Sequence, residues 1–446
     1  MAQKKIQDFN LGYALLRYYV DFALKLSYRN IRYVGREKVP QDGAVIYAPN
    51  HTNALMDALV ILAMDKKAKV FVARADIFKN PVLAKIFRFL KIMPIMPIMR
   101  MRDGLDEVKR NNETIEKAVD VLRDKVPFCI FPEGQHQAKY SSLPLSKGIF
   151  RIAFQAQELM PDVPLYIVPV GLRYGNFFRF RSTVRVQVVE PINVGEFIAA
   201  HAESSPQEQM NILRDILSER MRSSILYIPN DENYDAAYEI CATVVKSQVR
   251  QMARDGRKPK HELDAHFMAN RITVEQIERM KAEKPELAAR LLRLGAEASQ
   301  MRRQRHISLD SISIKYPILS RILKLLFVIV ALPYCLPVSI LTAPIKAVCS
   351  FVCGKMKDKA FHNSVRYLIN LILWPILMVI YSVIAFSVLP ALWAVPLIIL
   401  LLPAPIVAHE TWRLLRLAIS DIRLMCCKQL RAHYAEIKNI VFNQKD

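Results

Sequence analysis

A histidine and a carboxylate stand close together in the stretch NHTNALMD, residues 50–57. An apolar run precedes it and a helical pattern follows, so we expect His51 in a loop, Asn53 as the helix cap and Asp57 in the first helical turns. Within one helix the two side chains would be about 600° apart and would not meet. From a loop, His51 can receive the carboxylate, which fixes its tautomer and leaves the other ring nitrogen free to accept a proton.

This pair has no serine beside it, and such an arrangement suits direct general-base catalysis, in which the substrate alcohol is itself the nucleophile. The alternative is a capping contact without chemistry. The sequence has 12 glycines and contains no glycine-rich phosphate loop and no Gly-x-Ser-x-Gly elbow. Nucleotide-binding and serine-hydrolase classes therefore lose their main support.

The elements that must position the pair have the pattern of an α/β domain, which we place at residues 28–200. Apolar or β-branched runs alternate there with helical patterns, which predicts a mixed sheet flanked by helices. Five runs are strand candidates: Ala44–Ala48, Val70–Ala73, Phe128–Phe131, Leu165–Val170 and Val184–Val189.

Residues 1–27 are predicted to form an amphipathic helix rather than a signal peptide, because no apolar core follows the opening MAQKKIQDF. Apolar side chains recur at helical spacing, at Leu11, Leu15, Tyr19, Phe22 and Leu26, and a polar stripe follows at Arg17, Asp21 and Lys25. The apolar stripe rests either on the protein's own core or on a membrane interface.

Residues 201–315 are polar and helical in pattern, and they predict a helical connector that is solvated over most of its surface. One apolar stripe within it consists of Met210, Leu213, Leu217 and Met221. The role of this connector is open. Residues 409–446 are predicted to form a basic helical tail in the cytoplasm.

The composition predicts an anionic partner, because the 446 residues carry a net charge of +22 while 52% are hydrophobic. Residues 325–345 and 367–408 contain no Lys, Arg, Asp or Glu, and one membrane span needs about 20 such residues. Anionic membrane lipids are therefore favoured over nucleic acid as the partner, and residues 316–408 are the predicted membrane region. A large apolar core is the alternative.

The topology of this region depends on the basic residues between the two runs. If 325–345 crossed the membrane once, the next segment would lie outside with Lys346, Lys355, Lys357, Lys359 and Arg366, against the positive-inside tendency. A re-entrant 325–345, broken at Pro333 and Pro337, is therefore favoured over a single span. Residues 367–408 are expected to form a hairpin that turns near Pro390.

Four ordered blocks then give the chain a family resemblance. They are Asn50-His51 with Asp57, Pro-Ile-Met-Arg ending at Arg100, Phe-Pro-Glu-Gly at 131–134 and Val-Pro-Val at 168–170, and Lys147-Gly148 fits the usual Lys-Gly after the third block. Over roughly residues 25–195 the chain resembles the glycerol-3-phosphate and lysophosphatidate acyltransferase family. The spacing of five residues between histidine and aspartate, where four are commonest, is similar to that of a glycerol-3-phosphate acyltransferase branch. Gln135-His136 replaces the usual Thr-Arg, a departure that concerns the acceptor.

The resemblance implies that His51 deprotonates the acceptor hydroxyl and that Asp57 orients the histidine. It also implies that Arg100 holds the acceptor phosphate as a fork-shaped cation. Glu133 and Gly134, together with Lys147, are the other implied substrate-binding residues. For Glu133 the alternative is a cap on the next turn, while Arg102 and His136 are expected to be solvated or to support the residues that contact the substrate.

The predicted function is therefore that of an integral membrane O-acyltransferase of phospholipid biosynthesis, with its catalytic domain on the cytoplasmic face. It would move a fatty acyl group from acyl-CoA or acyl carrier protein to a hydroxyl of glycerol-3-phosphate or lysophosphatidate, without a metal or prosthetic group. Two alternatives stay open. One is another lysophospholipid or lipid acceptor, and the other is a non-catalytic lipid-binding membrane protein of the same fold.

Overall fold

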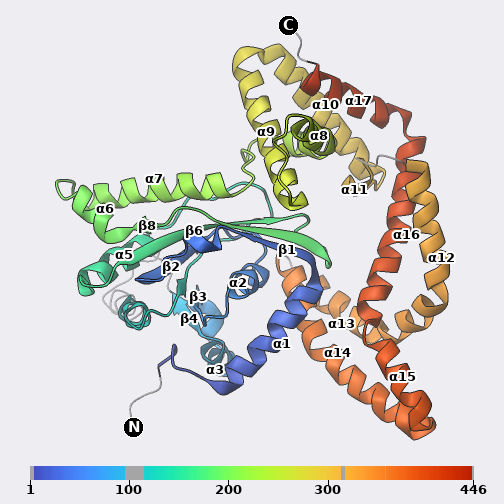
Figure 1. The fold of residues 1–446 in the computed structure, drawn as a ribbon, viewed down its shortest axis with the longest axis horizontal. Coiled ribbons are helices and arrows are strands. Elements are labelled where there is room, and N and C mark those ends of the chain that lie inside the picture. The colour runs from blue at the N-terminus through green and yellow to red at the C-terminus, as the bar shows by residue number, and fades with distance from the viewer. Residues whose placement is uncertain (1–4, 96–114, 313–316, 357, 444–446) are drawn as a thin grey trace. The chain divides into compact units, whose positions relative to one another are not determined.

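The structure is a computed structural model that describes residues 5–95, 115–312, 317–356 and 358–443 (Figure 1). The chain divides into two compact units. The first unit runs from the N-terminus to Ile225 and takes up a later segment, Met356–Tyr367. The second unit consists of Leu226–Lys355 and the chain from Leu368 onward.

The first unit is built on a mixed sheet, as the sequence predicted. The strands in the described ranges follow the order β1-β7-β6-β2-β5-β3-β4, and β8 pairs with β6. β6 is antiparallel to β7 and β8, whereas the other pairs are parallel. Their bounds are β1 Tyr28–Val34, β2 Ala44–Pro49, β3 Val70–Arg74, β4 Ile92–Ile95, β5 Phe128–Cys129, β6 Leu165–Tyr174, β7 Ser182–Val188 and β8 Ile192–Asn193.

All five strand candidates lie at strands of this sheet, and three further strands were missed. β1 (Tyr28–Val34) is an edge strand in which Arg29, Asn30 and Arg32 interrupt the apolar pattern that marks a buried strand. β8 (Ile192–Asn193) has only two residues. β4 (Ile92–Ile95) lies in a proline-punctuated run, and proline is tolerated there because β4 is the other edge of the sheet.

Helices α5 (Gly148–Leu159), α6 (Val194–Ala200) and α7 (Pro206–Ser224) pack against β6. The stripe Leu213, Leu217 and Met221 is buried in the same core as the central strands, so this part of the predicted connector covers the sheet instead of standing in solvent. A Cβ at Gly171 of β6 would come within 2.4 Å of Ser224 O at the end of α7. Only glycine permits that close approach.

Helix α1 (Leu11–Ser27) begins at Asn10, whose side chain accepts a hydrogen bond from Tyr13 N (3.1 Å). The stripe predicted to rest on an apolar surface is solvent-exposed or half-exposed in the protein. The protein's own core therefore does not cover it. α3 (Pro81–Phe89) contacts α1 through the Tyr13 and Phe89 rings and also exposes apolar side chains, at Val82, Leu83 and Ile86.

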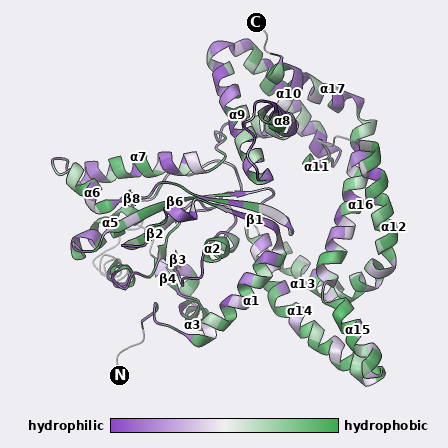
Figure 2. Ribbon diagram, in the orientation of Figure 1, coloured by the Kyte–Doolittle hydropathy of each residue, from purple (hydrophilic) through white to green (hydrophobic). Residues whose placement is uncertain are grey.

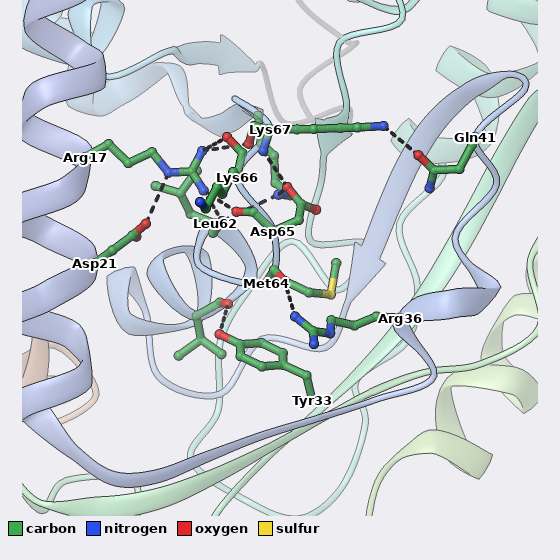
Figure 3. Close-up of polar contacts among 12 residues, drawn as sticks. Arg17, Asp21, Tyr33, Arg36, Gln41, Leu62, Met64, Asp65, Lys66 and Lys67 are labelled. Atoms are coloured by element: carbon green, nitrogen blue, oxygen red, sulfur yellow. Dashed lines mark hydrogen bonds and ion pairs between the residues drawn. The ribbon is translucent and has the colours of Figure 1, made fainter.

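The polar side of α1 holds helix α2 (Leu55–Leu62) in place. Arg17 is buried, and Figure 3 shows its guanidinium donating to carbonyl oxygens at the end of α2 and in the turn after it, those of Leu62, Asp65, Lys66 and Lys67. Tyr33 and Arg36 donate to Val60 O and Met64 O nearby (both 3.0 Å). Carbonyls at a helix end have no partner within the helix and favour cations, so these side chains fix the C-terminal end of α2.

The second unit contains a helical cluster of α8 (Tyr234–Arg254), α9 (Glu262–Glu283), α10 (Pro285–Gln304) and α17 (Lys428–Phe442). The fully buried Glu239 carboxylate accepts from Arg302 Nε (2.8 and 2.9 Å) and from Tyr434 OH (2.8 Å). A buried charge is tolerated when its partners are complete. This network joins α8 and α10 to the C-terminal helix.

After the short helix α11 (Leu309–Ile312) come the apolar helices, green over much of Figure 2, of which the last also carries charged side chains. They are α12 Pro317–Leu341, α13 Ala343–Gly354, α14 Phe361–Val388, α15 Ala391–Leu401 and α16 Ala404–Cys426. By length and composition, α12 and α14 can each cross a membrane among the described residues, and the bent pair α15 and α16 (50°) is a third possible span.

The prediction that Pro333 and Pro337 break this region is wrong, because α12 continues through both prolines. Proline is tolerated in such helices when neighbouring helices and side chains compensate the backbone, and α12 packs along α16. The break near Pro390 is found where it was expected, between α14 and α15.

Candidate active site

The candidate site lies where three neighbouring parallel strands end. β2 pairs with β6 on one side and with β5 on the other, so the loops that follow these strands emerge at one edge of the sheet. Asn50 extends this pairing: its side-chain oxygen accepts from Leu172 N (2.6 Å) and its amide donates to Leu172 O (3.2 Å). The asparagine therefore fixes the backbone just before His51.

His51 and Asp57 meet in the geometry expected from the sequence. His51 Nδ1 and Asp57 Oδ2 are 2.9 Å apart, with the histidine side chain 18% exposed and the aspartate fully buried. An ionised carboxylate only accepts hydrogen bonds, so Nδ1 carries the proton that is shared with Asp57. Nε2 is then unprotonated and can accept a proton from a bound hydroxyl.

The Asp57 carboxylate has three further donors. Thr52 N and Asn53 N donate to Oδ2 (both 2.7 Å), and Tyr174 OH, at the end of β6, donates to Oδ1 (2.7 Å). Burial first, and then the charge of Asp57, raise the pKa of Tyr174 well above its usual value, so the phenol stays protonated and donates. Tyr174 was not singled out in the sequence, because its contact depends on the pairing of β6 with β2.

The start of α2 differs from the sequence prediction. The residue before the helix is Ala54, and the buried Asn53 side chain has no hydrogen-bond partner in the part of the chain that the structure describes. Asn53 as the helix cap is therefore wrong. Instead, Asp57 reaches back from the first turn to two preceding backbone amides, a position where the helix dipole also favours negative charge.

Ala54 has φ +46°, a backbone conformation that residues with a side chain rarely adopt. This turn carries the chain from the His51 loop into α2 and lets Asp57 face the imidazole. Strained backbone of this kind costs about 1–3 kcal/mol and persists where the surrounding structure enforces it. Here the enforcing contacts are the bonds to Asp57 and the anchored far end of α2.

The loop after β5 covers the histidine. The Phe131 ring stacks on the His51 ring with centroids 4.1 Å apart, and Glu133 Oε2 accepts from His51 N (3.3 Å). Burial raises the pKa of Glu133 to about 8. Gly134 has φ +65° and closes a tight turn, with its N donating to Phe131 O (3.1 Å). Glu133 thus contacts the backbone of the histidine itself.

His136 is closer to the pair than the sequence suggested. Its ring stands edge-on to that of His51, with centroids 5.4 Å apart, and its Nε2 lies 2.8 Å from Asp358 Oδ2. Only 17% of the side chain is exposed, so of the two alternatives a supporting position behind the proposed base fits better than a solvated one. The one sequence signal was the departure at Gln135-His136, because Asp358 is 222 positions away.

Lys147 is not brought to the pair. Lys147 begins α5 in an exposed position, and its Nζ approaches Gln207 Oε1 of α7 (3.5 Å). Arg100 and Arg102 lie outside the described residues. Within the described ranges, no group of three or more His, Cys, Asp and Glu side chains is arranged to hold a metal ion.

A groove of about 630 Å³ in the second unit does not resemble a reaction site. It is lined by side chains of α14 and the following helix, none of which titrates: Met378, Val379, Ser382, Val383, Phe386, Ser387, Ile398 and Leu402. General acid–base chemistry therefore has no group in this lining.

Comparison with known proteins supports the motif resemblance. A protein-family model described as "Acyltransferase" matches residues 30–173. Glycerol-3-phosphate O-acyltransferase 2 of Saccharomyces cerevisiae is 25% identical over 295 residues, which are 61% of this chain and 38% of the yeast protein. A 1-acyl-sn-glycerol-3-phosphate acyltransferase of Cocos nucifera is 24% identical over 166 residues, or 37% of this chain and 49% of that protein.

Among solved structures, the 1-acyl-sn-glycerophosphate acyltransferase PlsC of Thermotoga maritima matches 48% of this chain and 87% of its own, with a TM-score of 0.34 and 20% identity. The chain spans less than half of the length of the yeast and coconut relatives. The resemblance read from the four blocks is confirmed: residues 30–173 are related to the glycerol-3-phosphate and lysophosphatidate acyltransferases.

Proposed function

We propose that this chain transfers an acyl group from a thioester donor to the hydroxyl of a glycerophosphate acceptor. The observation that carries the proposal is the His51–Asp57 pair, in which a fully buried carboxylate holds Nδ1 and leaves Nε2 free. The relationship of residues 30–173 to known acyltransferases gives that pair its reaction class.

The proposed reaction has two steps. His51 Nε2 takes the proton of the acceptor hydroxyl as its oxygen attacks the thioester carbonyl, and a tetrahedral intermediate forms. The carbon–sulfur bond then breaks, and the thiolate takes the proton back from the imidazolium. Asp57 stabilises the imidazolium between these steps, so one histidine serves first as base and then as acid.

Glycerol-3-phosphate is the acceptor we propose, with lysophosphatidate as the second candidate. The spacing of five residues between His51 and Asp57 resembles that of the glycerol-3-phosphate acyltransferase branch. Arg100 is proposed to hold the phosphate, with Glu133, Gly134 and Lys147 as further substrate-binding residues. Acyl-CoA and acyl carrier protein are both suitable donors, and no prosthetic group takes part in the proposed steps.

We further propose that the protein acts at a membrane that contains anionic lipids. α12 and α14 are each long and apolar enough to span a bilayer, and the exposed apolar side chains of α1 and α3 suit contact with the interface. The net charge of +22 favours an anionic surface. A cytoplasmic position of the first unit would give it access to thioester donors.

We also propose that α17 lies in the cytoplasm, which is tested by a cysteine introduced at Arg431 of α17 in a chain whose own exposed Cys426 is replaced by serine. An impermeant thiol reagent should leave it unlabelled in intact cells and label it after permeabilisation. Labelling in intact cells would place the C-terminal helix outside.

The activity is tested with the purified full chain in vesicles of zwitterionic and anionic lipid, supplied with labelled acyl-CoA or acyl carrier protein. Acceptors are glycerol-3-phosphate, lysophosphatidate, other lysophospholipids and glycerol. We expect label in the product of a phosphate-bearing acceptor and little in that of glycerol. Lipid binding without turnover of any acceptor would favour a non-catalytic lipid-binding protein and contradict the proposal.

A further inference from the structure

The candidate site receives a second aspartate from a remote part of the chain. The segment Met356–Tyr367 belongs to the first unit, although the chain between residue 226 and residue 355 belongs to the second. Within this segment, Asp358 contacts His136 (2.8 Å) and Phe361 places its ring edge-on to the same histidine, with centroids 4.8 Å apart. The family match ends at residue 173, so it does not contain this contact.

The two oxygens of the Asp358 carboxylate have different partners. Oδ1 accepts from Ala360 N (2.8 Å) and shapes the turn before α14, while Oδ2 faces His136 Nε2. The hydrogen bond from Ala360, and then the one from His136, hold the pKa of Asp358 below its usual value. Asp358 is therefore ionised at neutral pH and fixes the proton of His136 on Nε2.

The His136 ring is held in one position by these contacts. Asp358 fixes its Nε2, Phe361 packs against it, and His51 stands nearly perpendicular to it, with an interplanar angle of 76°. The backbone joins the same loops, since Gln137 N donates to His51 O (3.1 Å). Nδ1 is then the ring atom that remains for a hydrogen bond to a ligand, on a side chain next to the proposed base.

We propose that Asp358 is a positioning residue of the acyl-transfer site, which holds His136 beside His51 so that His136 binds the polar end of the acceptor. The site then requires the start of α14 as well as residues 30–173. This inference rests on the proposed function, because it assigns a role within that reaction.

A simpler role for Asp358 would be to cap the turn before α14. Asparagine separates the two roles. Its carbonyl oxygen still accepts from Ala360 N, but a neutral NH2 group replaces the charged oxygen that faces His136 Nε2. A capping role predicts no kinetic change for Asp358→Asn. A positioning role predicts weaker acceptor binding at unchanged stability.

The experiment compares Asp358→Asn, His136→Ala and the double variant in the full chain, with steady-state kinetics for acceptor and donor. Asp76→Asn is the matched control, because Asp76 is also about half exposed in the first unit and pairs with the surface residue Arg74 (2.8 Å). Each variant is checked by its thermal unfolding midpoint in detergent.

We expect Asp358→Asn to raise the acceptor KM about tenfold, the usual worth of a charge-assisted hydrogen bond, with the donor KM and the unfolding midpoint unchanged. Asp358→Asn should have no further effect in the His136→Ala background, because Asp358 acts through that histidine. Asp76→Asn should behave as the wild type.

The inference is overturned if Asp358→Asn leaves the acceptor KM within twofold of the wild type, or if its effect is undiminished without His136. A rise in acceptor and donor KM together with a lower unfolding midpoint would also overturn it, in favour of a structural role. An active wild-type chain with any of these results leaves the proposed function intact. A wild-type chain without turnover contradicts the proposed function itself.

Discussion

Two histidine–aspartate pairs lie side by side in the first unit, and they are built in opposite ways. His51 and Asp57 come from one loop and the helix after it, and the aspartate is fully buried with four donors. His136 and Asp358 come from segments 222 positions apart, and the Asp358 side chain is 54% exposed. The first carboxylate is fixed on all sides, whereas the second is held by a turn and one histidine.

This difference indicates that the two pairs have different roles, one as the base and the other in acceptor binding. A base must present one tautomer at every turnover, which requires a carboxylate shielded from water and completely hydrogen-bonded. A group that selects the acceptor needs only to be placed correctly, and a partly exposed partner suffices because its hydrogen bond orients the ring even where water weakens the charge–charge attraction. The predictions below test whether the pairs differ in this way.

The first prediction concerns the carboxylate of the buried pair. Asp57→Asn should lower kcat by about a hundredfold, because a neutral amide stabilises the imidazolium far less than a carboxylate, and an NH2 group at the Oδ2 position would favour the other imidazole tautomer. Steady-state kinetics measure this effect, with Asp76→Asn as the control. A kcat within threefold of the wild type would show that the buried aspartate is only a helix cap.

The second prediction concerns stability against pH. The pKa of Glu133 is raised to about 8, so between about pH 4.5 and 8 the folded protein keeps a proton that the unfolded chain has released. The free energy of unfolding should therefore fall as the pH rises through this window. Glu133→Gln removes the charge and still accepts from His51 N, so its stability advantage should grow toward pH 8.

Chemical denaturation of the wild type and Glu133→Gln at pH 5 and pH 8.5 measures that difference. Glu190→Gln is a control on the first unit, because Glu190 is exposed and pairs with Lys38 (3.1 Å). A difference between wild type and Glu133→Gln that is equal at both pH values would show that Glu133 is not buried as a neutral acid.

The smallest expected effect is at the turn between the histidine and the helix. Ala54→Gly should raise the free energy of unfolding by up to about 1 kcal/mol, since relief of the positive-φ strain exceeds the entropy that glycine loses. Turnover should be retained. Ala63→Gly, at the other end of α2 with φ −75°, should destabilise instead. Equal destabilisation by both glycines would show that Ala54 carries no strain.

The local features of the site were predictable from the sequence. His51, Asp57 and the strand before them lie within 14 residues, and short-range spacing decides whether such side chains can meet. The same holds for the loop with Glu133, because parallel strands that end together bring their loops to one edge of the sheet. The prediction that Asn53 caps α2 was wrong because Asp57 supplies the acceptor for the backbone amides before the helix.

The second pair was not predictable in this way. Asp358 lies after most of the second unit's helices, and no pattern of spacing connects it to His136. Tyr174 was missed for a related reason, since its role depends on the neighbour of β6 in the sheet. A break at Pro333 and Pro337 was predicted because proline disrupts a helix in water. In the structure α12 continues through both prolines, because packing against α16 supports it.

The central claim is that His51 and Asp57 perform the chemistry while His136 and Asp358 place the acceptor. It is tested most directly by kcat of His51→Ala and His136→Ala measured in parallel. We predict that His51→Ala lowers kcat by at least about a hundredfold in a folded, membrane-bound protein, the usual worth of a positioned general base. His136→Ala should chiefly raise the acceptor KM and keep most of kcat. A His51→Ala chain that retains kcat within a few-fold of the wild type, or a His136→Ala chain that loses kcat as severely as His51→Ala, would contradict the account.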